Sequence, residues 1–334
     1  MGSSTNLSAA APSPEFIKRF LTLANSDGVL SFDAFMRLAL YDDKLGYYRQ
    51  PHQRVGYEPG TDFFTATSTG PLFGELMACA GAQLLGAAQA AECTFVEIGV
   101  EPTGGILHQV AHHFKSARTI PMGAPLDLNG NCVIFSNELF DAQPCRRFTY
   151  RAGHWRELGV ACREGNLSET VMPPGDLPDY LPAKATEGYC VDAPEAATQL
   201  LDEIARQPWQ GLFIACDYGK TWPELIHETP QGTVRAYFRH TQSNDLLAHP
   251  GAQDLTCHVC WDWLVQILRQ HHFQDPGLQS QEAFLIHHAA PLLAEIAATE
   301  AGHLSDRKLG LMQLLHPAHL GQKFQVLHAR RQFT

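Results

Sequence analysis

The sequence lacks an excess of basic residues and a long apolar run. Lys and Arg together number 24 against 35 Asp and Glu, a formal net charge of −11. Nucleic acids and anionic membrane surfaces attract proteins through basic patches, so this charge balance argues against both as partners. The most apolar stretch, residues 76–91, is too short and too rich in Ala, Gly and Gln for a membrane span. We therefore expect a packed helix there.

Signs of export, of disulfides and of a metal site are also missing. The first residues, MGSSTNLSAAAPSPEF, contain no basic segment followed by an apolar one, so we expect no targeting peptide and a cytoplasmic location. The nine cysteines are scattered, mostly singly within apolar runs, which is typical of reduced core thiols. The stretch TCHVC (256–260) has no second cysteine pair, and Trp261, Leu264 and Leu268 follow it at helical spacing. We expect a helix start and no metal.

What the sequence does contain predicts an open α/β sheet. The stretches FVEIG (95–99), NCVIFSNEL (131–139) and GLFIACDYG (211–219) are short apolar runs with polar ends, as parallel strands buried on both faces should be. Pro71 opens a helical pattern of apolar residues. Residues 146–172 alternate and turn at glycines, which indicates an antiparallel portion. Ligands of such sheets bind outside the carboxyl ends of the strands.

Five segments, in this order, resemble the MidA-like family of S-adenosylmethionine-dependent methyltransferases. These relatives include the mitochondrial assembly factor that methylates an arginine of a respiratory complex I core subunit. The segments are FDAFMRLALYDDKLGYY (32–48), PGTDFFTATSTGPLFGEL (59–76), SNELFDAQPCRRF (136–148), GTVRAYFRHTQSNDLLAHPGAQDLTCHV (232–259) and MQLLHPAHLGQKFQVLHARR (312–331). The resemblance implies a Rossmann-like class I methyltransferase sheet. We expect an N-terminal arm, helix and lid loop (1–70), the methyltransferase core (71–225), and a substrate-side region with C-terminal helices and a strand (226–334).

The resemblance also implies a set of site residues. Asn137, Glu138 and Asp141 would be catalytic, because paired carboxylates recognise the planar guanidinium group and can accept a proton from it. Both carboxyl groups follow the end of a buried strand, so we expect them to face solvent. S-adenosylmethionine would contact the glycine turn and the lid loop, through Glu97, Gly99, Gly104, Gly105, Asp62 and Thr65. The substrate side would include Asp217, Tyr218, Arg235, Arg239, His240 and Asp254.

Each of these sets also has a purely structural reading. Asn137, Glu138 and Asp141 would suit a helix N-terminus, where a cap and acidic residues are stabilising. Asp62 and Thr65 are common turn residues, and Asp217 and Tyr218 would mark the end of a strand. The remaining substrate-side residues would pair with one another.

The cofactor half departs from the family pattern. Relatives have a strand ending in Glu-x-Gly-x-Gly-x-Gly, a second strand ending in an acidic residue, and another helix before the Asn-Glu motif. Here Glu97 and Asn137 are only 137 − 97 = 40 residues apart. After an expected helix at ILHQVAHHF (106–114), the interval has room for one short strand and a turn. We therefore expect the sheet to lack the second strand with its acidic end and its helix.

The glycine turn itself is altered as well. Glu101 stands where a glycine is expected, and Pro102 removes a backbone N–H group. These changes predict weakened or lost cofactor binding, unless Asp127 or Glu101 takes the ribose.

Two functions remain open at this stage. The first is methylation of a protein arginine, for example in a respiratory complex I subunit. The second is a catalytically degenerate relative that serves as a binding or assembly protein.

Overall fold

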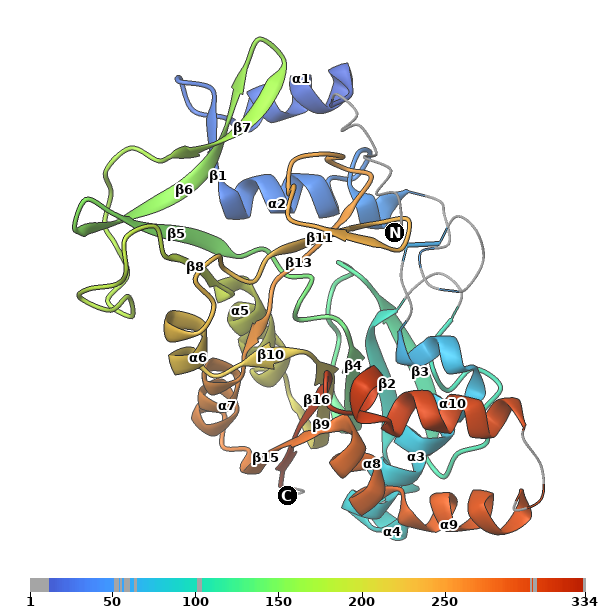
Figure 1. Cartoon of the computed structure of the whole chain (residues 1–334). Helices are drawn as coiled ribbons and strands as arrows, with labels where there is room; N and C mark the ends of the chain where they lie inside the picture. The colour runs from blue at the N-terminus through green and yellow to red at the C-terminus, as the bar shows by residue number, and fades with distance from the viewer. Residues whose placement is uncertain are drawn as a thin grey trace.

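The computed structural model describes residues 12–50, 54, 56, 61–62, 65–100, 104–300, 302 and 305–332. Its centre is a six-stranded sheet with the strand order β15-β16-β9-β4-β2-β3 (Figure 1). The bounds are β2 Thr94–Val100, β3 Ser116–Pro121, β4 Gly130–Asn137, β9 Trp209–Asp217, β15 Gln274–Ser280 and β16 Gln325–Arg331. The three apolar runs of the sequence form β2, β4 and β9, as predicted.

The strands β3, β2, β4 and β9 are parallel, whereas β16 runs antiparallel to both β9 and β15. The parallel strands β2, β4 and β9 therefore end at one edge of the sheet. Their successive side chains alternate between two apolar cores, with Phe95 in one core and Val96 in the other. This burial on both faces explains the continuous apolar runs.

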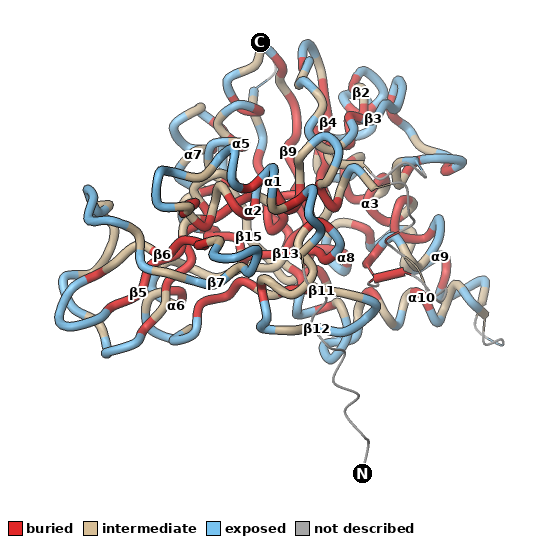
Figure 2. Tube along the Cα trace, turned by 90° about the horizontal axis from the view of Figure 1, so that it is seen from above, coloured by how far each residue is buried: buried red, intermediate tan, exposed pale blue. Residues whose placement is uncertain are grey.

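Helices cover both faces of this sheet. One core packs against α3 Pro71–Leu85, α4 Ala87–Ala90, α8 Gln281–His288, α9 Ala290–Thr299 and α10 Asp306–Leu315. The other packs against α5 Glu195–Ala205 and α7 Trp261–Gln270. Figure 2 shows buried residues along the central strands and exposed residues in the outer loops. The helix expected after the cysteine pair is confirmed as α7.

A second, antiparallel sheet joins the N-terminal part to the middle of the chain. Its order is β1-β6-β5-β8, with β7 paired to β6, and β1 comes from the N-terminal segment. The bounds are α1 Pro14–Leu23, β1 Val29–Ser31, α2 Phe32–Tyr41, β5 Arg146–Arg151, β6 His154–Arg163, β7 Asn166–Val171 and β8 Cys190–Ala193. The antiparallel portion predicted for residues 146–172 is confirmed as β5, β6 and β7.

Short elements complete the fold around the sheet edge. They are η1 Tyr47–Arg49, η2 Ala66–Thr69, β10 Gly219–Lys220, α6 Trp222–His227, β11 Arg235–Phe238, β12 Thr241–Ser243, β13 Asp254–Thr256, β14 Val259–Cys260 and η3 Pro317–Gly321. Strand β10 pairs in parallel with β14, and β11 pairs with β12 and β13. These pairings bring the family-like segment 232–259, which we call the C-terminal signature, beside the ends of β4 and β9.

The interval between β2 and β4 differs from two expectations. The prediction that the second strand is absent was wrong, because β3 pairs with β2 along its length. The helix expected at 106–114 is absent as well: residues 106–109 form a turn and residues 110–114 are irregular. As predicted, no helix follows β3, since the described residues 122–129 are irregular, and no acidic residue stands at its end, Pro121-Met122. The interval is too short to close both crossovers with helices.

The described part of the chain also contains no disulfide, no cluster of metal-binding side chains and no helix that could span a membrane. All nine cysteines are free thiols. Among the described residues, no group of three or more metal-binding side chains is placed to hold an ion, and no helix is both long and apolar enough to cross a membrane.

Candidate active site

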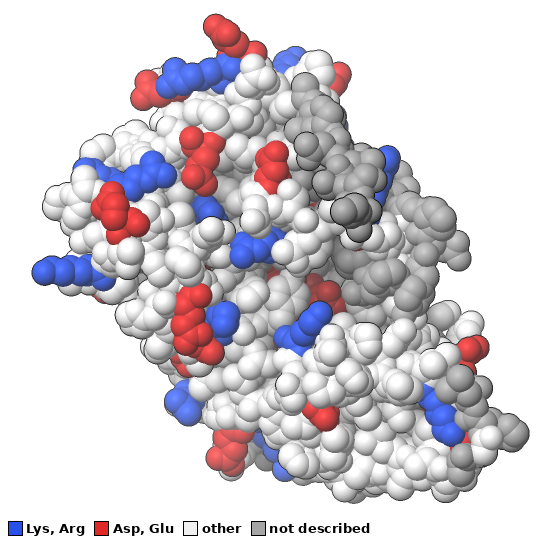
Figure 3. Space-filling view, viewed as in Figure 1, with Lys and Arg blue, Asp and Glu red and all other residues white. Residues whose placement is uncertain are grey.

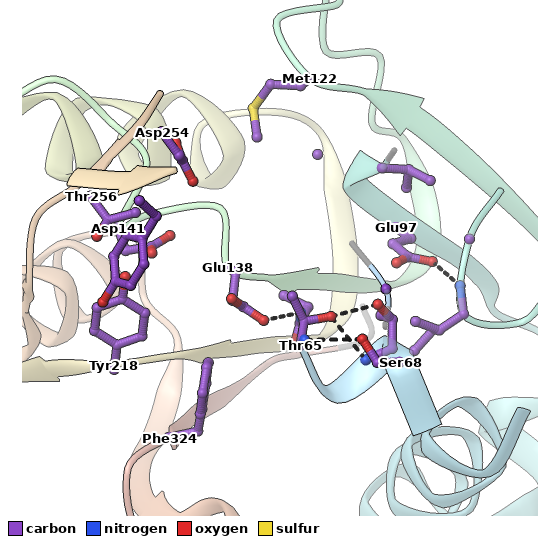
Figure 4. A pocket seen from close by; sticks show the side chains of 18 of the residues that line it. Thr65, Ser68, Glu97, Met122, Glu138, Asp141, Tyr218, Asp254, Thr256 and Phe324 are labelled. Carbon is purple, nitrogen blue, oxygen red and sulfur yellow. Dashed lines mark hydrogen bonds between the residues drawn. The ribbon is translucent and has the colours of Figure 1, made fainter. Parts of the chain in front are cut away.

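A cavity of about 1050 Å³ opens at the carboxyl ends of β2, β4 and β9. Its wall combines segments that are far apart in sequence: the glycine turn, the lid loop, the SNELFDA loop, β10 and the C-terminal signature. The crevice expected from the strand ends is therefore present. In Figure 4, Asp141, Tyr218, Thr256 and Asp254 form one group, Thr65, Ser68 and Glu97 form another, and Glu138 lies between them.

The loop after β4 is held by a buried carboxyl group. Asp217, at the end of β9, is fully buried, and its Oδ2 accepts hydrogen bonds from the backbone N–H groups of Phe140 (2.9 Å) and Asp141 (3.3 Å). Burial and the nearby Asp141 raise the pKa of Asp217 well above its usual value. Asp217 thus positions the loop and is not among the cavity-lining residues.

Glu138 adopts an unusual backbone conformation where β4 gives way to this loop. Its φ of 51° lies in the left-handed region, which is strained for a non-glycine residue. This conformation lets the half-buried side chain line the cavity, where its Oε1 accepts a 3.1 Å hydrogen bond from Nδ2 of Asn137. Loss of water around the carboxyl group, and then the charge of Asp141, raise the pKa of Glu138 well above its usual value. No helix follows, so the helix-capping reading is not supported.

Two further carboxyl groups lie in the same part of the cavity. Asp141 and Asp254 each have only 2% of their surface exposed, and both line the cavity. Burial raises the pKa of Asp141 to about 6, and a hydrogen bond with the Tyr218 hydroxyl opposes this. The Tyr48 hydroxyl donates a 3.0 Å hydrogen bond to Oδ1 of Asp254. We call Glu138, Asp141 and Asp254 the acidic wall.

The sequence suggested that Asp141 faces open solvent, and this was wrong. The loop turns inward after Glu138, so that Asp141 is buried beside the Tyr218 hydroxyl. Its Oδ1 is buried without a hydrogen-bond partner among the described residues, and the same holds for Oδ1 of Asn137. Unpaired buried acceptors are costly, and a bound donor would satisfy them.

The glycine turn forms the other end of the cavity. Glu97 is nearly buried, and its Oε2 accepts a 2.7 Å hydrogen bond from the N–H group of Ile106. Burial raises the pKa of this carboxyl group to about 7. A Cβ atom added to Gly105 would lie 2.4 Å from Glu97 Oε2, and Gly99 has a φ of 86°. The backbone at Gly99 therefore favours glycine, and a side chain at Gly105 would have to displace the Glu97 carboxyl group. Gly104 also lines the cavity, whereas Glu101 and Pro102 lie outside the described residues.

The two lid-loop candidates play different parts. Thr65 lines the cavity and caps η2, where its hydroxyl accepts a hydrogen bond from the N–H group of Thr67. Asp62 is buried: its Oδ2 accepts from the Tyr47 hydroxyl at 2.7 Å, and its Oδ1 accepts from the N–H group of Arg239 at 2.8 Å. Asp62 therefore ties the lid loop to the turn between β11 and β12.

Three other substrate-side candidates are not among the described lining residues. Arg235 donates hydrogen bonds to the backbone carbonyls of Gly232 and Val234. The guanidinium group of Arg239 lies over the Phe238 ring, and Nε2 of His240 is 2.9 Å from the hydroxyl of Thr61. The structure brings Tyr218 and Asp254 to the cavity and leaves these three around it.

Several lining residues were not singled out from the sequence. They include Tyr48, Met122, Lys220, Tyr237, Thr256, His258, Lys323 and Phe324. Tyr48 belongs to the Gly-Tyr-Tyr motif, which could have pointed to it. Met122 could have been predicted only if β3 had been predicted, because it directly follows the end of that strand. Lys220, Tyr237, Thr256 and His258 depend on the pairing of β10 with β14 and of β11 with β13. Lys323 and Phe324 depend on the pairing of β16 with β9. No local pattern specifies these pairings.

Comparison with known proteins identifies the family. A family model described as "Putative S-adenosyl-L-methionine-dependent methyltransferase" matches residues 88–278 of the chain. This chain belongs to that methyltransferase family. The match spans both the glycine turn and the SNELFDA loop, so the MidA-like resemblance is confirmed.

Solved structures share the fold of this methyltransferase-family chain. One, from Burkholderia thailandensis, is described as a "likely methyl transferase" bound to S-adenosyl-homocysteine. It is 24% identical, with a TM-score of 0.83, and the match covers 97% of this chain and 95% of that chain. A native structure from the same organism is 23% identical, with a TM-score of 0.79 and the same coverage. No curated protein matches the sequence. The Rossmann-like class I fold is thereby confirmed.

Proposed function

We propose that this chain transfers a methyl group from S-adenosylmethionine to a guanidinium nitrogen of a protein arginine. The observation that carries the proposal is the acidic wall, which lines the same cavity as the glycine turn. A guanidinium group is always charged and presents planar N–H donors, which carboxylates match. The MidA-like resemblance supports a respiratory complex I subunit as the protein that carries this arginine.

The residues of the glycine-turn end fit the methionine part of the cofactor. Gly99, Gly104 and Gly105 keep the backbone free of side chains where it lines the cavity, and the Glu97 carboxyl group faces the same space. Thr65 and Ser68 add hydroxyl groups there. The bound cofactor supplies a methyl group on an electrophilic sulfonium. The end of β3 fits less well, because Met122 lines the cavity where relatives have an acid for the ribose.

The acidic wall has two tasks in this reaction. First, Glu138 and Asp141 hold the guanidinium group, and Asn137 offers its buried Oδ1 as a further acceptor. Second, one carboxyl group takes the proton that the nitrogen loses. The raised pKa values of Glu138 and Asp141 suit proton acceptance better than ordinary carboxyl groups would. The hydrogen bond from Tyr48 fixes the orientation of Asp254.

The test is methyl transfer to arginine peptides with Glu138→Gln and Asp141→Asn variants. We expect methylated arginine with the native chain and a loss of at least about 100-fold in either variant, the scale of general-base catalysis. Glu203→Gln and Asp43→Asn, at exposed positions, are matched controls and should keep activity. Thermal unfolding checks that the variants fold. Undiminished transfer in both cavity variants would contradict the proposal.

A second function is favoured by one observation, the absence of an acid at the end of β3. Hydrogen bonds to a charged group contribute about 1.5–3 kcal/mol, so this loss would weaken cofactor binding by about 10- to 150-fold. In that case the chain would bind an arginine-bearing partner as an assembly protein without transferring methyl groups. Calorimetric titration with S-adenosylhomocysteine separates the two, because no detectable binding, with arginine peptides still bound, would favour the second.

A further inference from the structure

The cavity has a basic side as well as the acidic wall. Lys220, His258 and Lys323 line it and together form what we call the basic rim. Lys220 belongs to β10, His258 directly precedes β14, and Lys323 lies shortly before β16. Figure 3, viewed as Figure 1, shows both acidic and basic side chains around the hollow in the middle of the molecule. The methyl-transfer chemistry proposed above does not use this basic rim.

Tyr218 contacts both the acidic wall and the basic rim. On one side its hydroxyl contacts Asp141. On the other, its ring packs edge-on against His258 and Phe324, with 5.5 Å between ring centroids in each case. The pairing of Gly219 with Val259 and of Lys220 with Cys260 fixes this arrangement. Tyr218 therefore contacts a residue of the acidic wall and a residue of the basic rim, and both sets of charged side chains line a single cavity.

The basic rim is available to a ligand. The one acid within ion-pair distance of Lys220 among the described residues is Glu228, at 4.0 Å, and its side chain is 63% exposed, so this pair is weak. No ion pair involves Lys323 within the described ranges, and it is exposed. Nδ1 of His258 is buried without a hydrogen-bond partner among the described residues. Burial, with Lys220 and Arg235 nearby, lowers the pKa of His258 to about 4, so the positive charge resides on the lysines.

We propose that Lys220 and Lys323 bind an acidic side chain of the peptide substrate, close in sequence to the arginine that enters the acidic wall. The basic rim then determines specificity: the preferred substrate carries an arginine and a nearby Asp or Glu. This inference rests on the proposed function, since it assumes that a protein arginine occupies the acidic wall. A substrate with two opposite charges also fixes its own orientation, because the reverse placement would put like charges together.

The experiment measures binding of peptides by fluorescence anisotropy. Each amidated peptide has one arginine in a Gly/Ser background, with Glu scanned through the four positions on either side, and a matched peptide has Gln at the same position. We expect Glu in at least one position to tighten binding by about 3- to 5-fold, the upper part of the range for a partly exposed ion pair. The Lys220→Gln/Lys323→Gln double variant should reduce this preference to less than about 2-fold.

Controls keep the inference separate from the proposed function. Lys184→Gln, at an exposed position outside the cavity lining, should retain the preference. Gln-containing peptides should bind the double variant as they bind the native chain, which shows that the variant folds. A Glu preference at no position, or one that survives in the double variant, would overturn the inference. A peptide with citrulline in place of arginine tests the other claim, because equal binding of citrulline and arginine would overturn the proposed function whatever the Glu preference.

Discussion

The two ends of the cavity differ in the contacts that hold their loops in place. At the acidic wall, Asp217 holds the SNELFDA loop through two backbone N–H groups, and Tyr48 fixes Asp254. At the glycine-turn end, β3 is followed by irregular chain without a helix, and Met122 stands at the end of that strand. The end that we propose for the guanidinium group is therefore anchored by contacts between distant segments, whereas the end that we propose for the ribose lacks the acid of the family pattern.

Removing the Asp217 carboxyl group should disturb the acidic wall more than any other change and so reduce the difference between the two ends. Asp217→Ala would leave the buried N–H groups of Phe140, Asp141 and Tyr218 without this acceptor. We expect a loss of roughly 2–4 kcal/mol in the free energy of unfolding, together with loss of arginine-peptide binding. Urea denaturation measures the first. Asp43→Ala, at an exposed position, is the control and should change stability by less than about 0.5 kcal/mol.

An acidic residue introduced at the end of β3 should strengthen cofactor binding there and so reduce the difference between the two ends of the cavity. Met122→Asp places a carboxyl group at the end of β3, on the cavity wall. The native chain should bind S-adenosylhomocysteine no tighter than tens of micromolar, and the variant should bind about 10- to 150-fold tighter. Calorimetric titration of both proteins measures this. Sub-micromolar binding by the native chain would show that the missing acid does not impair the site.

The pKa of Glu97 predicts a pH dependence of stability. Its carboxyl group ionises near 4.3 when unfolded and near 7 when folded, so the unfolded state loses its proton first. Its stabilising contribution is complete below about pH 4 and is lost as the pH rises to about 7. Glu97→Gln removes this loss, so the stability of the variant relative to the native chain should increase over that range, by about 3 kcal/mol. A constant difference in unfolding free energy between pH 4 and 7 would contradict the burial of this carboxyl group.

The smallest expected effect concerns Tyr48. Tyr48→Phe removes the hydroxyl that donates to Asp254 and should lower the free energy of unfolding by about 1 kcal/mol. Tyr237→Phe is a matched control, because the Tyr237 hydroxyl bonds only to the exposed Gln242, at 3.1 Å, among the described residues. Arginine-peptide affinity should fall in the first variant more than in the second. Equal effects would mean that Asp254 does not depend on Tyr48 for its position.

The sequence by itself determined the central strands and the two ends of the site. Continuous apolar runs predicted β2, β4 and β9 because parallel strands buried on both faces leave no polar position. The 40-residue interval between Glu97 and Asn137 limited what could follow the glycine turn, since the chain has a fixed length per residue. It did not decide that a strand would form there, because a short segment gains its hydrogen bonds only from a neighbour such as β2.

Only the tertiary structure determined which charged side chains line the cavity and which are buried as hydrogen-bond acceptors around it. Asp141 was expected in solvent, yet the left-handed turn at Glu138 and the two hydrogen bonds to Asp217 direct it inward. The roles of Asp62 and Asp217 as buried acceptors, and the presence of Lys220 and Lys323 at the same cavity as the acidic wall, follow from contacts between distant segments. Local sequence fixes which residues end a strand. Which of them meet is set by strand order and loop packing, whose energies arise between residues far apart in the chain.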